Sequence, residues 1–244
     1  MAGLLGTHYR AAHEPEREQF LGMILKHARG DVDGVEFREY FVGRDARLKL
    51  EYDIAWANQF IIDTLLSAFP QARFIVLIRD PYTWLQSICG HLISRRIPAD
   101  VRAFLDWWFK PELYPHSDED RVLQDRGLYS VAAFLQAWDR HIHGCTRQIP
   151  PEQLLVLRTH ELVRSHERLA QFLQIPIDSL DRRQGNVNRG SWADRLESLI
   201  DRAYIEETVQ SICRENMARY FPEVTTLESA GKLWDGWTGA SGIR

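Results

Sequence analysis

Five consecutive apolar residues, Phe74–Ile78, constrain the fold of this chain more than any other feature of its sequence. A continuous apolar run of this kind predicts a strand that is covered on both faces, as strands are in a parallel sheet. Arg79, Asp80 and Pro81 follow at once. Proline suits the first position of a helix, because its missing N–H would have no partner there. The stretch "FIVLIRDPYTWLQS" therefore predicts a buried parallel strand that leads directly into a helix.

The remaining sequence alternates between predicted strands and helices. A second buried strand is predicted in "QLLVLRTHEL" and a short alternating strand in "RLKLEYD", whereas the period of "DGVEFREYFVGRD" fits a helix or a strand. Helical patterns cover residues 17–30, 55–70, a segment from about 82, 99–109, 129–149, 165–175 and 191–221. This alternation predicts an α/β fold with a mostly parallel sheet flanked by helices, in a single domain over residues 1–244.

The composition narrows the class of protein. The net charge of -4 argues against nonspecific binding to nucleic acid or to an anionic membrane, and no apolar run approaches the roughly 20 residues that span a bilayer. Cys89, Cys145 and Cys213 lie far apart and form no CxxC pair, which favours a reducing compartment over a disulfide framework. The N-terminus has no basic region ahead of a long apolar stretch. We therefore expect a cytoplasmic protein.

Several polar residues follow the predicted strands. In a parallel α/β sheet, ligands bind beyond the carboxyl ends of the strands. Asp53, Arg79 and residues 158–160 are therefore expected to converge on one edge. Ser87 lies eight residues after Arg79, and a guanidinium and a hydroxyl spaced in this way can grip one phosphate through a charge-assisted and a neutral hydrogen bond. The alternative is a surface ion pair between Arg79 and Asp80, with Ser87 facing water.

The stretch "IRDPYTWLQS" resembles the element with which sulfotransferases bind the 3′-phosphate of their donor, 3′-phosphoadenosine 5′-phosphosulfate (PAPS). That element is a strand, then R-x-P, then a serine eight residues after the arginine, and Arg79, Pro81 and Ser87 match it. "LLVLRTHELVRSHERLAQFLQI" is similar to a second family element of strand, turn and helix, with "THEL" in place of a "YEDL"-like turn. "NVNRGSW" resembles, more weakly, the basic loop that closes over the 3′-phosphate, which implies Arg189 and Gly190 as further donor-binding residues.

The resemblance implies a three-layer, P-loop-like α/β fold that transfers a sulfuryl group from PAPS to a hydroxyl of a small molecule, glycan or lipid, without a metal. Glu14 matches the position of a catalytic glutamate in some sulfotransferases, with His13 and Glu16 as neighbouring candidates. Asp53 takes the place of a histidine base in other members. From the residues alone, Glu14 could instead belong to an acidic helix start, and Asp53 could cap the helix that follows it.

The sequence also departs from the family. Sulfotransferases open with a strand and a phosphosulfate-binding loop, usually a Lys or Arg followed by Ser-Gly-Thr-Ser/Thr, whose N–H groups hold the 5′-phosphosulfate. This chain contains no such loop and no GxxxxGK[ST] motif. We expect the first strand to be missing, through truncation, through degeneration or because another element fills the gap. A poor sulfotransferase is therefore expected. The alternative is a noncatalytic nucleotide-binding or interaction protein of the same fold, and the absent Walker lysine disfavours a P-loop kinase.

Overall fold

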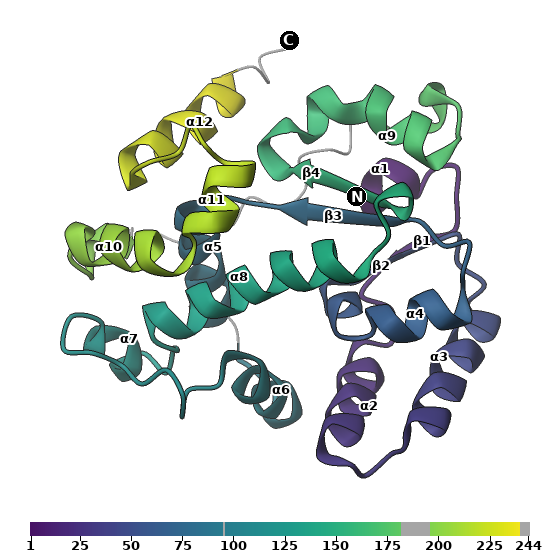
Figure 1. Ribbon diagram of the computed structural model, residues 1–244, viewed down its shortest axis with the longest axis horizontal. Coiled ribbons are helices and arrows are strands. Elements are labelled where there is room, and N and C mark those ends of the chain that lie inside the picture. The colour runs from purple at the N-terminus through teal and green to yellow at the C-terminus, as the bar shows by residue number, and fades with distance from the viewer. Residues whose placement is uncertain (95, 182–195, 240–244) are drawn as a thin grey trace. The chain divides into compact units, whose positions relative to one another are not determined.

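A computed structural model describes residues 1–94, 96–181 and 196–239 of the chain (Figure 1). Its helices and parallel strands confirm the predicted α/β class. The described residues form two compact units, each assembled from separate stretches of sequence. Unit 1 contains residues 1–76, 144–157 and 161–181, and unit 2 contains residues 77–143, 158–160 and 196–239. A single domain over residues 1–244 stays a prediction.

A parallel pair of short strands lies near the start of unit 1. After α1 (Ala2–Leu5), β1 (Ala11–His13) pairs in parallel with β2 (Tyr52–Ile54). The sequence pattern does not predict β1, because three residues are too few to show a period. Parallel strands need a crossover connection, and α2 (Arg17–Arg29) and α3 (Gly34–Leu48) supply it.

The segment "DGVEFREYFVGRD", whose period fits a helix or a strand, forms the N-cap and most of the helix α3. It begins at Asp33, whose carboxylate accepts hydrogen bonds from two backbone N–H groups of the first turn. Its buried face carries Phe41, whose ring centroid lies 5.1 Å from that of Phe20 in α2 and 5.0 Å from that of Phe37. Since α3 runs to Leu48, the predicted strand "RLKLEYD" is wrong in its first part, and only its end enters β2.

The second strand pair confirms the two strongest strand predictions. β3 (Phe74–Ile78) pairs with β4 (Leu154–Arg158), and the two arrows point the same way in Figure 1. No residue of β3 is exposed, as expected for a strand covered on both faces. The described strands thus form two two-stranded sheets instead of the one larger sheet expected.

The remaining described elements of unit 1 are helices and short 3₁₀ turns that lie wholly or mainly in that unit. They are η1 (Trp56–Phe60), α4 (Ile62–Ala68), η2 (Pro151–Gln153), η3 (Thr159–Ser165), α9 (His166–Leu173) and η4 (Ile177–Ser179).

Unit 2 consists mainly of helices around an aromatic core. Phe104, Phe109 and Phe134 are fully buried there, and the rings of Phe109 and Phe134 meet edge to face at 4.8 Å. The helical stretch predicted at 191–221 consists, over its described part, of three separate helices. None of the helices in the described ranges is both long and apolar enough to cross a bilayer. The elements are α5 (Pro81–Ile93), α6 (Ala99–Phe109), α7 (Arg121–Asp125), α8 (Val131–Gln148, whose last residues belong to unit 1), η6 (Leu196–Ser198), α10 (Arg202–Ile212), α11 (Arg214–Tyr220) and α12 (Leu227–Gly239).

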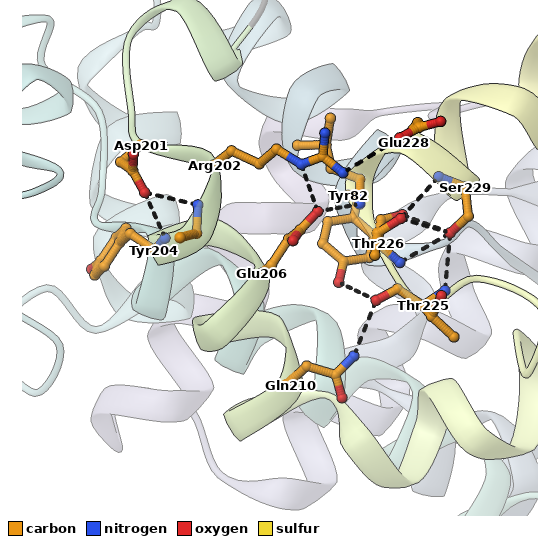
Figure 2. A network of polar contacts seen from close by, with 12 residues as sticks. Tyr82, Asp201, Arg202, Tyr204, Glu206, Gln210, Thr225, Thr226, Glu228 and Ser229 are labelled. Atoms are coloured by element: carbon orange, nitrogen blue, oxygen red, sulfur yellow. Dashed lines mark hydrogen bonds and ion pairs between the residues drawn. The ribbon is translucent and has the colours of Figure 1, made fainter.

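A polar network ties α10 and the start of α12 to the first turn of α5 (Figure 2). The Tyr82 hydroxyl and Gln210 Nε2 both donate to the Thr225 carbonyl, at 3.5 and 3.4 Å. Glu206 Oε1 accepts a hydrogen bond from the Leu227 N–H at 2.9 Å. Burial raises the pKa of Tyr82 to about 12, so that its hydroxyl keeps the proton it donates. The network therefore fixes the beginning of the helix that follows Arg79.

Candidate functional site

Three of the predicted site residues lie at the carboxyl ends of β1 and β2. The strand register places Ala12 opposite Asp53 and His13 opposite Ile54. The Glu14 N–H donates to the Ile54 carbonyl at 2.9 Å and so extends the pairing by one residue. His13 is exposed, and its Nδ1 lies 3.3 Å from the same carbonyl. The structure thus brings His13, Glu14 and Asp53 to one edge of a parallel strand pair.

The backbone directly after β1 has an unusual conformation. Glu14 has φ 50° and Glu16 has φ 53°, so both occupy the left-handed region that residues with a side chain seldom adopt. Such conformations cost on the order of 1–3 kcal/mol each and persist only where the surroundings enforce them. We call residues 14–16 the acidic turn. It separates β1 from α2, whose N-cap is Glu16.

A buried arginine from α3 holds the acidic turn. Arg44 is 4% exposed, and its Nη2 donates to the Pro15 carbonyl at 2.9 Å. Its Nη1 donates to Asp53 Oδ2 at 2.5 Å, and its Nε lies 3.8 Å from the Glu16 carboxylate. The guanidinium also lies over the ring of Phe20, 4.8 Å from the centroid. One side chain therefore joins the end of β2 to the backbone of the acidic turn.

These contacts give Asp53 a defined partner. Both of its carboxylate oxygens face Arg44, at 2.5 and 3.5 Å. Removal of this carboxylate would take the nearest acidic partner from a buried guanidinium, which is costly. The alternative role as a helix cap is wrong, because the N-cap of the following η1 is Ala55 and no side chain caps it. The geometry favours Asp53 as an anchor for Arg44 rather than as a proton acceptor.

Glu14 has a different environment. Its side chain is 22% exposed and lies 3.6 Å from Arg17, which is itself 40% exposed. A solvent-exposed ion pair of this kind contributes about 0–1 kcal/mol, so a ligand can displace it at little cost. The acid in the first turn of α2 is Glu18, and Glu14 precedes that helix. The Glu14 and Asp53 side chains are similarly exposed, at 22% and 29%, but the described partner of Glu14 is the half-exposed Arg17, whereas that of Asp53 is the buried Arg44.

A tyrosine hydroxyl is buried in the same part of unit 1. Among the described residues, the Tyr40 hydroxyl has no hydrogen-bond partner. Burial raises the pKa of Tyr40, and the nearby Glu16 carboxylate raises it further, while Arg44 and Arg47 act in the opposite direction. The hydroxyl thus stays protonated next to the groups that hold the acidic turn.

The second group of candidate residues lies in unit 2, where β3 leads into α5. Asp80 is fully buried and caps α5, because its carboxylate accepts hydrogen bonds from the Thr83 N–H, at 2.9 Å, and from the Thr83 hydroxyl. Arg79 Nε donates to Thr83 Oγ1 at 3.0 Å, and the Arg79 carbonyl accepts from Trp138 Nε1 at 2.9 Å. The surface-pair alternative does not describe this geometry, since Asp80 is an internal cap.

Thr83 and Ser87 are four residues apart on one face of α5, and Arg79 directly precedes the N-cap of that helix. Ser87 is exposed and Arg79 is half-buried. Burial lowers the pKa of Arg79, and the attraction of Asp80 offsets this only in part. A guanidinium that has lost part of its hydration gains from contact with an anion. The start of α5 thus offers one positive charge and the exposed hydroxyl of Ser87, while the Thr83 hydroxyl is bound between Arg79 and Asp80.

Two contributors to the site were not predicted, and one predicted pair falls elsewhere. Thr83 could have been found from its spacing, because it stands midway between Arg79 and Ser87. Arg44 could have been found because it continues the buried face of Phe37 and Phe41, and a charged residue on such a face requires a partner. Arg189 and Gly190 lie outside the described residues.

The fold and these residues together define an α/β protein that carries polar groups at the carboxyl ends of parallel strands, where this class binds its ligands. A family model described as "Sulfotransferase domain" matches residues 36–189, which is more than half of the chain. The protein therefore belongs to the sulfotransferase family, as its resemblance predicts, and sulfuryl transfer is the chemistry of that family. The matched range includes Asp53, Arg79 and Ser87 and begins after Glu14. A search of curated proteins finds no match.

Proposed function

We propose that this protein transfers a sulfuryl group from PAPS to a hydroxyl of a small molecule, glycan or lipid. The observation that carries the proposal is the start of α5, where the half-buried guanidinium of Arg79, held by Thr83, precedes a helix that carries the exposed hydroxyl of Ser87. Membership of the sulfotransferase family supports the type of reaction. PAPS supplies the sulfuryl group when it is bound. The chain's own residues bind the donor, orient the acceptor and take up the proton of its hydroxyl.

Arg79 and Ser87 are proposed to hold the 3′-phosphate. A phosphate accepts charge-assisted hydrogen bonds from a guanidinium and neutral ones from a hydroxyl, so the residues present fit this group. Thr83 Oγ1 accepts a hydrogen bond from Arg79 Nε at 3.0 Å and so fixes the direction of the guanidinium. The proposal concerns this end of the donor alone, because the sequence contains no phosphosulfate-binding loop for the other end.

Arg189 and Gly190 are proposed to close over the same phosphate. The described chain resumes at Leu196, whose N–H donates to Gln86 Oε1 at 2.6 Å. Gln86 is the neighbour of Ser87 on α5. Arg189 and Gly190 lie outside the described ranges, and their assignment rests on the resemblance of "NVNRGSW" to the basic loop of the family.

Glu14 is proposed as the general base that takes the proton of the acceptor hydroxyl. Its carboxylate is partly exposed and bound only weakly by Arg17, whereas the Asp53 carboxylate is engaged by a buried arginine. His13 is exposed beside it and is the next candidate. Glu16 is less suited, since its carboxylate accepts a hydrogen bond from Arg47 at 3.0 Å.

The setting of the protein follows the same reasoning. Cys89, Cys145 and Cys213 are free and buried, which suits a reducing compartment, and we propose the cytoplasm. Burial raises the pKa of all three thiols, so none is a ready nucleophile. We further propose a single domain over residues 1–244 that acts without a metal and without nucleic acid.

A noncatalytic nucleotide-binding protein of the same fold is the second candidate, because residues 1–244 contain no motif for the phosphosulfate end of the donor. Calorimetry with adenosine 3′,5′-bisphosphate and with ATP, followed by incubation with radiolabelled PAPS and a panel of phenols, sugars and lipid alcohols, separates the possibilities. We expect preferential binding of the bisphosphate and slow transfer of label. Binding of the bisphosphate without any transfer would favour the second candidate, and a preference for ATP would contradict both.

A further inference from the structure

We propose that Arg44 is a positioning residue that holds the acidic turn in its left-handed conformation and thereby presents Glu14 to the acceptor. This inference rests on the proposed function, since it assigns a purpose to the carboxylate of Glu14. Its structural basis is independent of that function. It lies in the contacts that one buried side chain makes around a turn with two unfavourable backbone angles.

Three nitrogens of Arg44 contact either the acidic turn or the residue that holds Arg44 in place. Nη2 reaches the Pro15 carbonyl at 2.9 Å, and that carbonyl lies between the two residues with positive φ. Nε lies 3.8 Å from the carboxylate of Glu16. Nη1 is fixed in turn by Asp53 at the end of β2. A planar fork that uses its separate nitrogens in this way defines direction as well as charge, which a lysine ammonium cannot do.

The backbone conformation of the acidic turn distinguishes the contacts of Arg44 from those of an ordinary buried ion pair. Glycine would adopt φ values of 50° and 53° without steric cost, yet the chain has glutamate at both positions. The side chains must therefore be useful there, or the surroundings must enforce the strain. Arg44 does the enforcing through the Pro15 carbonyl, while the Glu14 N–H is held by the Ile54 carbonyl on the opposite side.

A purely stabilising role for Arg44 is the competing explanation. In that case the pair with Asp53 would only fasten α3 to β2, and the direction of Glu14 would not depend on it. Arg47 provides the matched comparison, because it lies one turn further along α3 and also binds Glu16, at 3.0 Å. Arg47 is 56% exposed, and its described contact is to the side chain of Glu16 rather than to the backbone of the turn.

The test compares Arg44→Lys with Arg47→Met in the full chain. Native-state hydrogen exchange is measured at the Glu14 amide, and the Leu65 amide in α4 serves as the internal reference. We expect Arg44→Lys to speed exchange at Glu14 by roughly tenfold or more, and Arg47→Met to change it by less than about twofold, with Leu65 unaffected in both. Equal exchange at Glu14 in both variants would overturn the proposal.

The same two variants are then compared in transfer of label from PAPS to the best acceptor of the panel. Arg44→Lys should lower kcat by roughly tenfold or more with the KM for PAPS within about twofold, because a misdirected base affects the transition state and not donor binding. Faster exchange at Glu14 with unchanged kcat would overturn the positioning role. A wild-type chain that transfers no label contradicts the proposed function itself. That outcome is read from the wild type alone, and the exchange experiment still decides whether Arg44 holds the turn.

Discussion

Two arginines show how differently the two units of this protein use a buried positive charge. In unit 1, Arg44 is almost completely buried, and its nitrogens contact a carboxylate and a backbone carbonyl of the protein itself. In unit 2, Arg79 is half-buried, its Nε contacts the neutral hydroxyl of Thr83, and burial lowers its pKa in spite of Asp80. Arg44 is thus held by acceptors of the protein itself, whereas we expect the partly dehydrated charge of Arg79 to gain from contact with an added anion.

This difference separates the residues that organise a site from those that bind a ligand. A guanidinium matched by internal acids stabilises a local geometry, and its removal leaves those acids without a partner. A guanidinium beside hydroxyl groups and an exposed serine can reorganise around a phosphate at little cost. We therefore expect changes around Arg44 to alter stability and the rate of proton transfer, and changes around Arg79 to alter donor affinity.

The largest effect is expected when Glu14 is substituted. It would assign the proton-transfer step to unit 1 and so sharpen the comparison between the two units. Glu14→Gln keeps the size of the side chain but removes the base, so the rate of transfer should fall by about 10²–10⁴. The affinity for adenosine 3′,5′-bisphosphate should stay the same. Single-turnover transfer of labelled sulfate measures the rate.

Asp53→Asn is the control for this substitution, measured at a temperature where the variant is folded. This substitution removes the negative charge that lies closest to Arg44 and leaves Glu14 unchanged. If folded Asp53→Asn loses all transfer while Glu14→Gln keeps it, the base lies at the end of β2, and the acidic turn has no catalytic role.

The next largest effect concerns the stability of unit 1. Arg44→Met should lower the free energy of unfolding by about 3 kcal/mol or more, because it leaves the Asp53 carboxylate and the Pro15 carbonyl without their partner. Urea unfolding followed by circular dichroism gives the value. Arg47→Met, which removes an exposed ion pair, should cost about 1 kcal/mol or less. Equal losses in the two variants would mean that Arg44 is no better integrated than a surface arginine.

A smaller effect is expected in the response of unit 2 to acid. Burial lowers the pKa of His141 in α8 to about 4, from 6.5. The unfolded chain therefore binds this proton first, and the free energy of unfolding should fall as the pH drops from about 6.5 towards 4. In His141→Gln, the free energy of unfolding should depend less steeply on pH over this range, by a slope that corresponds to at most one proton. An unchanged slope in the variant would show that other groups govern the response.

The smallest effect is expected at Tyr40. Its hydroxyl is buried without a partner among the described residues, so Tyr40→Phe should change the free energy of unfolding by less than about 0.5 kcal/mol or raise it. Thermal unfolding of the variant measures the change. A loss well above this value would indicate that the hydroxyl has a partner in solution, such as a water molecule bound to Glu16.

Much of this architecture could be read from the sequence, and the exceptions have physical reasons. The apolar runs of β3 and β4 and the turn into α5 are local signals, so they were predictable. The strand β1 has only three residues, and the period of α3 is confused by aromatic residues on more than one face. The division of the end of the chain into α10 and α11 depends on packing that no local pattern contains.

The candidate site divides in the same way. Arg79 and Ser87 belong to one continuous segment, and their spacing on a helix can be read directly. The contact between Arg44 and Asp53 joins α3 to β2 directly, and Arg44 also reaches the acidic turn, whose backbone angles have no sequence signature. For this reason Asp53 looked like a base or a cap from the sequence, and only the structure gives it a partner.

The central claim is that Arg79 binds the 3′-phosphate of the donor while Arg44 serves the protein itself, and calorimetry on two variants tests it most directly. Arg79→Ala should weaken binding of adenosine 3′,5′-bisphosphate by about 1.5–3 kcal/mol, the contribution of a hydrogen bond to a charged group. Binding of adenosine 5′-monophosphate, which lacks the 3′-phosphate, should hardly change, and Arg44→Lys should bind both ligands like the wild type. Equal losses for both ligands in Arg79→Ala, or the same loss in Arg44→Lys, would contradict the claim.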